Sequence, residues 1–253
     1  MFVLTTEGYV NCLNPNIRMY KYKAISGNGK NGERRNHHIC IDLDKETCYE
    51  ITFLSGMNII MSDKLEIMGK DDKFYSVDAL KFGVKVALMR TPDEVIEKNK
   101  HKYIYIQLVK ELLSIIKQSG YIRRLNQDAF YCDFVVEWNK EELDTFVISL
   151  DNIGIYIKVK KVFREDRDKF LLTADSEALN SLLEFMKDNN MKREIRDNEN
   201  LLKMNIDRER DFIQIVKEVK KIEEPTLFLK NKSGIDSWDN IVIDGVIMRT
   251  IEE

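Results

Sequence analysis

The sequence predicts an α+β protein: a β-rich N-terminal barrel or sandwich followed by a three-helix, mixed α/β C-terminal half. The first ninety residues consist of short β-like runs separated by turn residues. At Thr91 the pattern changes to a helical one, and two further helical patterns lie among later strand-like runs. This change divides the chain into a β-rich domain, residues 1–90, and an α+β domain, residues 91–253.

The strand-like runs of the first half are rich in β-branched and aromatic residues. Asn14-Pro15-Asn16 and Ser55-Gly56 are two of the turn signals between them. The predicted strands are 2–5, 9–13, 17–25, 39–43, 49–54, 59–61, 64–68 and 84–89.

A helix start is predicted at Thr91, because Pro92 would occupy the first helical position and Glu94 would complete a capping box. Apolar residues recur on one face through 103–116, and Gly120 is the expected end of the helix. Continuity across 99–102 is left open by the sequence.

The second half is predicted to alternate between strands and helices. Strands are expected at 121–125, 130–138, 146–150, 153–163, 226–229 and 241–248. A second helix contains Leu179, Leu182, Leu183 and Met186, and a third begins near Asp207 and ends at 223–225. A weak α-β-β repetition links 103–138 with 175–206.

Composition excludes several classes of protein. The net charge is only −3, but residues 1–35 carry +4, so any basic surface must be local. Four cysteines without a C-x-x-C pair indicate reduced structural thiols. Because the sequence shows no secretory pattern and no apolar run of membrane-span length, a cytoplasmic protein without membrane contact is expected. Few prolines beside abundant Lys, Ile and Asn suggest an AT-rich source, such as a phage or mobile element.

A G-x-G-x-x-G string occupies Gly27–Gly32. Such glycines can cradle phosphates when a strand precedes them and a helix follows. Here residues 39–44 alternate as a strand, and neither H-R-D nor D-F-G occurs, so the kinase alternative also fails. The string is therefore interpreted as a hairpin connector rather than a nucleotide site, and no cofactor is expected.

Asp42 and Asp44 share one face of the strand that follows. Apolar-Asp-apolar-Asp after a glycine turn superficially resembles the polymerase-β-type nucleotidyltransferases, which would imply Mg²⁺ held by paired carboxylates. The sequence departs from that family in two ways. The family has a helix before the glycine turn, whereas residues 17–25 are predicted to form a strand. The family also has a third carboxylate on a nearby strand, and none can be assigned here. There are two alternatives to a Mg²⁺ site. This face of the strand is exposed to solvent without a ligand, or it holds a transition metal through His38 and Cys40.

Cationic and aromatic side chains interleave on both sides of the glycine string, a combination that suits single-stranded nucleic acid, since rings stack on bases and cations follow phosphates. The candidate partner-binding residues are Arg18, Tyr20, Lys21, Tyr22, Lys23, Lys30, Arg34, Arg35, His37 and His38. Trp138 and Trp238, beside acidic turns, are weighed as anchors for a protein partner or as core residues.

Three functional hypotheses follow. The first is a non-enzymatic regulatory protein, such as an inhibitor, that engages nucleic acid or a nucleoprotein machine through the basic hairpin. The second is a Mg²⁺-dependent nucleotidyl or phosphodiester enzyme that uses Asp42 and Asp44. The third is a protein–protein inhibitor that acts through the acidic C-terminal half.

Overall fold

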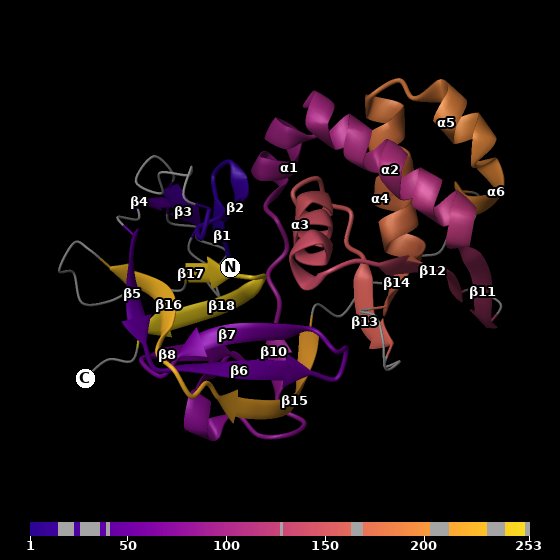
Figure 1. Cartoon of the computed structure of the whole chain (residues 1–253). Helices are drawn as coiled ribbons and strands as arrows, with labels where there is room; N and C mark the ends of the chain where they lie inside the picture. Colours follow the sequence, from indigo (N-terminus) through magenta and orange to yellow (C-terminus); the bar gives the residue numbers. More distant parts are fainter. Residues whose placement is uncertain are drawn as a thin grey trace. The chain divides into compact units, whose positions relative to one another are not determined.

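The computed structural model describes residues 1–14, 23–25, 36–38, 41–126, 129–162, 169–202, 213–231 and 241–250. Strands and helices both occur in quantity, so the α+β class is confirmed. Contacts divide the chain into two compact units (Figure 1): unit 1 is Met1–Arg90 with Phe212–Glu253, and unit 2 is Thr91–Asp211.

The described part of unit 1 is made of strands and one short 3-10 helix. The elements are β1 Phe2–Thr5, β2 Gly8–Asn11, β3 Lys23–Ile25, β4 Asn36–His38, β5 Ile41–Glu46, β6 Cys48–Phe53, β7 Asn58–Ser62, β8 Leu65–Met68, β9 Phe74–Ser76, η2 Val77–Ala79, β10 Lys85–Ala87, β15 Ile213–Lys221, β16 Thr226–Asn231, β17 Ile241–Ile243 and β18 Val246–Thr250. Most predicted strands of the first ninety residues are found with slightly shifted ends; the one predicted at 17–25 is described only over β3.

The largest sheet has the order β4-β3-β1-β17-β18-β8-β9, with β2 also paired to β1. The β17–β18 hairpin therefore lies at its centre, with Val3 opposite Ile243 and Met248 opposite Ile67. Asp244 and Gly245 form its turn, both with positive φ, as a type I′ hairpin turn requires. The Asp244 carboxylate also accepts a 2.7 Å hydrogen bond from the Phe2 amide.

The segment predicted to form a third helix is a strand where it is described. β15 pairs with β10 on one side and β6 on the other, in the sheet β10-β15-β6-β7. The register shifts between Val216 and Glu218, so that Val216 and Val219 both face the side of Phe53 and Ile51. This bulge turns the period of two into a spacing of three, which imitates a helical stripe in the sequence.

Strand pairing also groups the last part of the chain with the first. β15 pairs with β6, β16 with β5, β17 with β1 and β18 with β8. The division of the chain at Thr91 that the sequence predicts places residues 213–250 in the second half. The pairings make unit 1 discontinuous in sequence, with unit 2 inserted into it.

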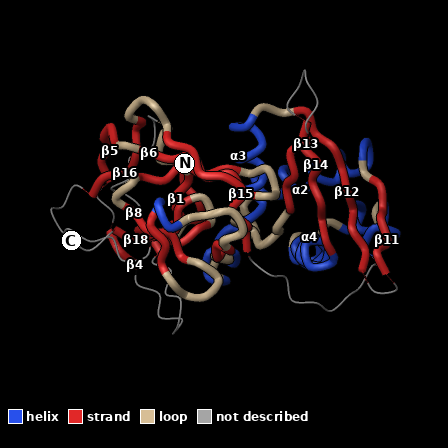
Figure 2. Tube along the Cα trace, turned by 90° about the horizontal axis from the view of Figure 1, so that it is seen from below, coloured by secondary structure: helices blue, strands red, loops and turns tan. Residues whose placement is uncertain are grey.

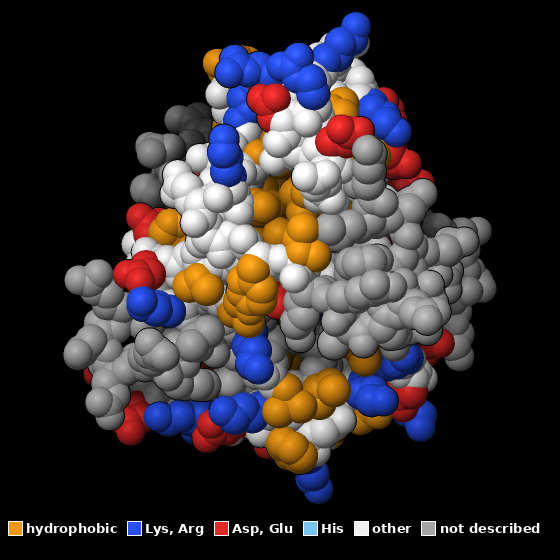
Figure 3. All heavy atoms as spheres, turned by 90° about the vertical axis from the view of Figure 1, so that its right-hand side faces the viewer, with side chains coloured by type: hydrophobic (Ala, Val, Ile, Leu, Met, Phe, Trp, Pro, Cys, Tyr) orange, Lys and Arg blue, Asp and Glu red, His pale blue; other side chains and the backbone are white. Residues whose placement is uncertain are grey.

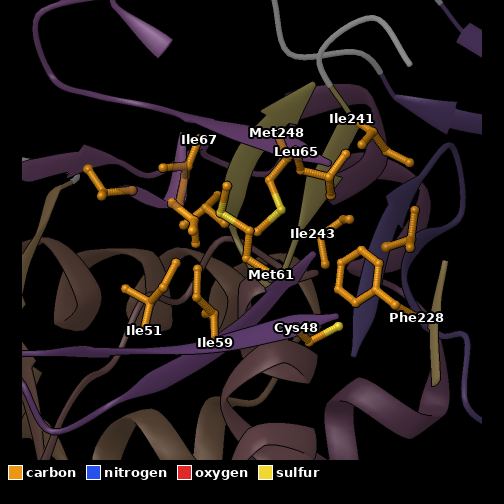
Figure 4. Packing of buried hydrophobic residues seen from close by; sticks show 14 of the residues in the cluster. Cys48, Ile51, Ile59, Met61, Leu65, Ile67, Phe228, Ile241, Ile243 and Met248 are labelled. Carbon is orange, nitrogen blue, oxygen red and sulfur yellow. The ribbon is translucent and has the colours of Figure 1, made fainter. Parts of the chain in front are cut away.

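The core of unit 1 collects side chains from strands that are far apart in the sequence. Figure 4 shows Ile51, Met61, Ile67, Phe228 and Ile243 directed toward one another, and each is fully buried. β6 to β8 supply three of these residues, and the C-terminal strands supply the other two. The core therefore requires both sequence segments of the unit.

Unit 2 is a four-stranded sheet with helices. The elements are α1 Asp93–Asn99, α2 Tyr103–Ser119, β11 Tyr121–Asn126, β12 Ala129–Glu137, α3 Lys140–Asp151, β13 Lys158–Val162, β14 Lys169–Asp175, α4 Ser176–Asp188, α5 Lys192–Asp197 and α6 Glu199–Leu202.

The strands of unit 2 lie in the order β11-β12-β14-β13, all antiparallel, as Figure 2 shows. The buried hydrophobic residues of β12 alternate along the strand: Cys132, Phe134 and Val136. Opposite Phe134 lies Leu172, also buried, and helices α2 and α4 contact these two strands. One face of the sheet therefore forms the core of unit 2.

The strand predicted at 146–150 is wrong, because these residues belong to α3. Asn139 caps this helix, and Leu143, Phe146, Val147 and Leu150 form its buried stripe. The second half of the helix is rich in β-branched and aromatic residues, which is typical of a strand, whereas the cap that marks the helix start lies seven residues before Phe146.

The predicted capping box at Thr91 is also wrong. Pro92 is itself the N-cap of α1, without a side-chain cap, and the Thr91 amide instead donates to the Tyr156 hydroxyl at 2.9 Å. The helix breaks after Asn99 and resumes at Tyr103, which answers the question left open by the sequence. Gly120 does end α2, but with extended backbone; a Cβ there would lie 2.4 Å from the Ile116 carbonyl oxygen.

The α-β-β repetition is not seen in the described residues, because α4 is followed by α5 and α6 rather than by strands. A different regularity is present. Each half of the sheet is a hairpin followed by a helix: β11-β12 with α3, and β13-β14 with α4. The second strands of the two hairpins form the central pair, and an Asn or Asp caps each helix.

Candidate functional site

The basic hairpin predicted from the sequence is described only at its base. β3 and β4 pair antiparallel, with Lys23 opposite His38 and Ala24 opposite His37. Arg18, Tyr20, Lys21, Tyr22, Lys30, Arg34 and Arg35 lie outside the described residues. The pairing brings the backbones of Lys23, His37 and His38 together.

The glycine string joins these two strands. Residues 26–35 connect the end of β3 with the start of β4, and the next described element after the glycines is a strand rather than a helix. The dinucleotide fingerprint needs a helix whose N-terminus faces the phosphates. The described neighbours therefore agree with a hairpin connector.

Asp42 and Asp44 lie on β5, which pairs with β16 in a two-stranded sheet. Lys230 is opposite Asp42 in this register. The exposed Asp44 carboxylate accepts a 2.9 Å hydrogen bond from the Lys45 amide. Among the residues whose positions are described, no group of three or more His, Cys, Asp or Glu side chains could hold a metal ion.

A groove of about 630 Å³ lies between α2 and α3, entirely within unit 2. This volume falls within the ~300–1,000 Å³ that is typical of ligand pockets. We call it the α2–α3 groove. It is lined by Leu108, Glu111, Trp138, Asn139, Glu141, Glu142, Thr145, Phe146 and Ser149.

Two aromatic side chains form the apolar part of the α2–α3 groove. The Trp138 and Phe146 rings meet edge to face, with centroids 4.9 Å apart and planes at 63°. Phe146 is buried, whereas Trp138 is only partly buried. The indole is therefore held in place by the core and still offers surface to an apolar or cationic group.

The first turn of α3 is fixed by a capping box. The Asn139 side chain accepts a 2.9 Å hydrogen bond from the Glu142 amide, and the Glu142 carboxylate accepts one of 3.1 Å from the Asn139 amide. These reciprocal bonds satisfy two amides that the helix leaves unpaired. They also hold the Glu142 carboxylate at the groove.

The charge of the α2–α3 groove is negative. Glu111, Glu141 and Glu142 line it, and none of its lining residues is Lys, Arg or His. Glu111 and Glu141 are exposed, and their side chains have no hydrogen bond or ion pair within the described chain. The nearby Lys140 is occupied by Asp144, at 2.6 Å. The groove therefore has uncompensated negative charge beside an aromatic surface.

From the sequence, Trp138 is weighed as an anchor for a partner or as a core residue, and Glu111 and Glu141 are not among the candidate site residues. Glu111 and Glu141 lie on different helices, and one of these helices was predicted as a strand. The available signal was Asn139 with Glu142, which is the spacing of a capping box. Trp238, the other proposed anchor, lies outside the described residues.

The described cysteines, Cys12, Cys48 and Cys132, are buried and unbridged. Burial raises the pKa of each thiol to about 11, and the charge of Asp133 adds to the effect at Cys132. These thiols are protonated at neutral pH, so none is a ready nucleophile.

Comparison with known proteins gives no family. No protein-family model matches the chain, and no curated protein matches it significantly. Within the described ranges, no helix combines the length and the apolar character needed to cross a membrane.

Proposed function

We propose that the chain is a non-enzymatic regulatory protein that binds a basic segment of a protein partner in the α2–α3 groove. The observation that carries this proposal is the combination of two unpaired glutamates with the Trp138 surface in one concavity. It develops the third hypothesis, that of a protein–protein inhibitor acting through the acidic half of the chain.

Physical chemistry supports a partner with both positive charge and an apolar side chain. An exposed ion pair contributes at most ~1 kcal/mol, so charge alone would give weak and salt-sensitive binding. Aromatic residues at the centre of an interface contribute more, and Trp is among the residues most enriched there. Carboxylates around the indole would then orient the partner and speed its association.

Charge reversal at Glu111 is expected to weaken this binding about tenfold, because it places a cation in the groove that must receive one. The probe is a helical peptide of lysine and leucine, titrated at low salt into the full-length Trp238→Phe variant, whose single indole is Trp138. Binding is read as a change in indole emission.

Glu184→Lys is the matched control, since Glu184 is also an exposed helical glutamate and lies outside the groove. Equal affinities of the Glu111→Lys and Glu184→Lys variants would contradict the role of the groove. An unchanged emission spectrum at saturating peptide would contradict contact with Trp138.

A second candidate function is nucleic-acid binding through the hairpin of β3 and β4. The specific observation is their antiparallel register, which places Lys23 opposite His38, next to His37, at the base of the hairpin. This candidate retains the first hypothesis, a regulator of nucleic acid or a nucleoprotein machine.

The triple variant Lys30→Glu, Arg34→Glu and Arg35→Glu is expected to lose binding to a single-stranded oligonucleotide, because phosphate contacts supply most non-specific affinity. The measurement is fluorescence anisotropy at low salt. Glutamate at the exposed Lys81, Lys85 and Lys220 of the same unit is the control. If both triple variants lose affinity equally, the effect is one of net charge and the hairpin is not the site.

A further inference from the structure

The walls of the α2–α3 groove are helical. All its described lining residues belong to α2, to α3 or to Trp138 and Asn139, the two residues that connect β12 with α3. The backbone N–H and C=O groups inside a helix are used in its own hydrogen bonds. The walls therefore offer no strand edge on which an extended segment could pair.

A segment that enters this groove must satisfy its own backbone. Backbone groups that face the groove walls lose contact with water, and leaving them without a partner costs free energy. An α-helix bonds these groups internally and presents side chains on one face at spacings of three and four residues. The groove therefore favours a helical segment, as in the binding of amphipathic helices to hydrophobic grooves.

Side chains along the two walls form rows that suit such a helix. Glu141, Thr145 and Ser149 follow one another at spacings of four on α3, which makes a ridge of about 12 Å. On α2, Ile104 precedes Leu108 by four residues and therefore shares its face. Ile104 is 69% exposed, so apolar surface continues beyond the groove itself. A helix laid in the groove would pack against both rows.

The two ends of the groove differ in charge. The Asn152 side-chain amide, at the end of α3, donates a 3.4 Å hydrogen bond to the Tyr105 hydroxyl near the start of α2. Ile104 and Leu108 lie near this contact on α2, whereas Glu141 is in the first turn of α3. The groove therefore has an apolar end and a separate acidic end.

The acids of α5, elsewhere in unit 2, are paired with cations. The Glu194 carboxylate lies 3.7 Å from the Lys110 ammonium. The Asp197 carboxylate lies 3.6 Å from Arg193 and 3.5 Å from Arg196. Figure 3, which views the side of the molecule where α5 and α6 lie in Figure 1, shows Lys and Arg side chains at the top with Asp and Glu among them. A basic segment would therefore find net negative charge in the α2–α3 groove rather than at α5.

We propose that the occupant of the α2–α3 groove is an amphipathic α-helix of the partner, with lysine or arginine at one end of its buried face and apolar residues at the other. The cations pair with the carboxylates near the start of α3, and the apolar side chains contact Leu108 and Ile104. This inference rests on the proposed function, since it names the conformation and the pattern of the basic segment that binds there.

The test compares two peptides of lysine and leucine with the same sequence of about fourteen residues, which is four helical turns. One contains L residues only, and the other has D residues in a central turn, which do not fit a right-handed helix. Each is titrated into the full-length Trp238→Phe variant, and the emission of Trp138 is measured. The all-L peptide is expected to bind about tenfold more tightly, because only it can present the cations and the leucines on one helical face.

The apolar end of the groove is tested by Ile104→Ala. This change is expected to weaken binding of the all-L peptide about fivefold, because it removes apolar surface that the helix would cover. Tyr103→Ala is the matched control and is expected to bind normally. Tyr103 is the preceding residue of α2, is 74% exposed and faces a different side of the helix.

The outcomes separate this inference from the proposed function. Equal affinities of the two peptides would overturn the helical occupant and leave the proposed function standing, since a basic segment would still bind. Equal affinities of the Ile104→Ala and Tyr103→Ala proteins would overturn the position of the apolar end. Binding of neither peptide would contradict the proposed function itself, and this inference with it.

Discussion

Replacement of Phe134 by alanine is expected to lower the free energy of unfolding of unit 2 by about 3–5 kcal/mol, the usual cost of removing a buried phenylalanine. Phe134 is fully buried on the core face of the central strand β12, opposite Leu172 on β14. The lost ring leaves a cavity between the sheet and the helices that cover it. Unit 1 has a separate cluster of buried residues, so its unfolding is expected to be unaffected.

Chemical denaturation followed by hydrogen exchange of segments from each unit measures this effect. Val135→Ala is the matched control, because Val135 is the next residue on β12, faces the other side of the sheet and is 38% exposed. A Phe134→Ala protein in which both units lose stability equally would show that they unfold together.

Removal of residues 241–253 is expected to unfold unit 1 completely. The deletion takes away β17 and β18, which connect β1 to β8 in the largest sheet. It also removes the buried side chains of Ile243 and Met248 and the Asp244 bonds to Phe2. Without β17 and β18, β1 and β8 would each lose a neighbouring strand. The two remaining parts of the sheet would then no longer share a core.

Hydrogen exchange is again the measurement: the amides of β1 and β8 should lose protection, whereas those of β12 should keep it. Deletion of 251–253 alone is the control, because it leaves β17 and β18 in place. If β1 and β8 stayed protected after the longer deletion, the C-terminal hairpin would not be essential to the sheet.

Much of the fold could be predicted where the local pattern and the tertiary environment agree. The helix around Leu179 and Leu182 is predicted because its apolar residues recur at helical spacing without interruption. The sequence pattern of β15 predicts a helix, since a bulge hides the alternation of the strand. The grouping of β15 to β18 with β1 to β10 could not be predicted, because strand pairing depends on residues more than a hundred positions apart.

The candidate sites differ in how far the sequence could reveal them. The basic hairpin is visible because its residues are close together in the chain. The α2–α3 groove unites Glu111 with Glu141, and only the packing of two helices brings these carboxylates together.

The position of the β17–β18 hairpin also fixes an order of events on the ribosome. Unit 2 is a continuous segment, so its synthesis is finished before that of β15 to β18. Domains generally fold as units during synthesis, the N-terminal one first. Here β1 is made before unit 2, but its neighbour β17 is made only after unit 2. Unit 2 can therefore be folded while the first strands of unit 1 are still without the strands that they pair with.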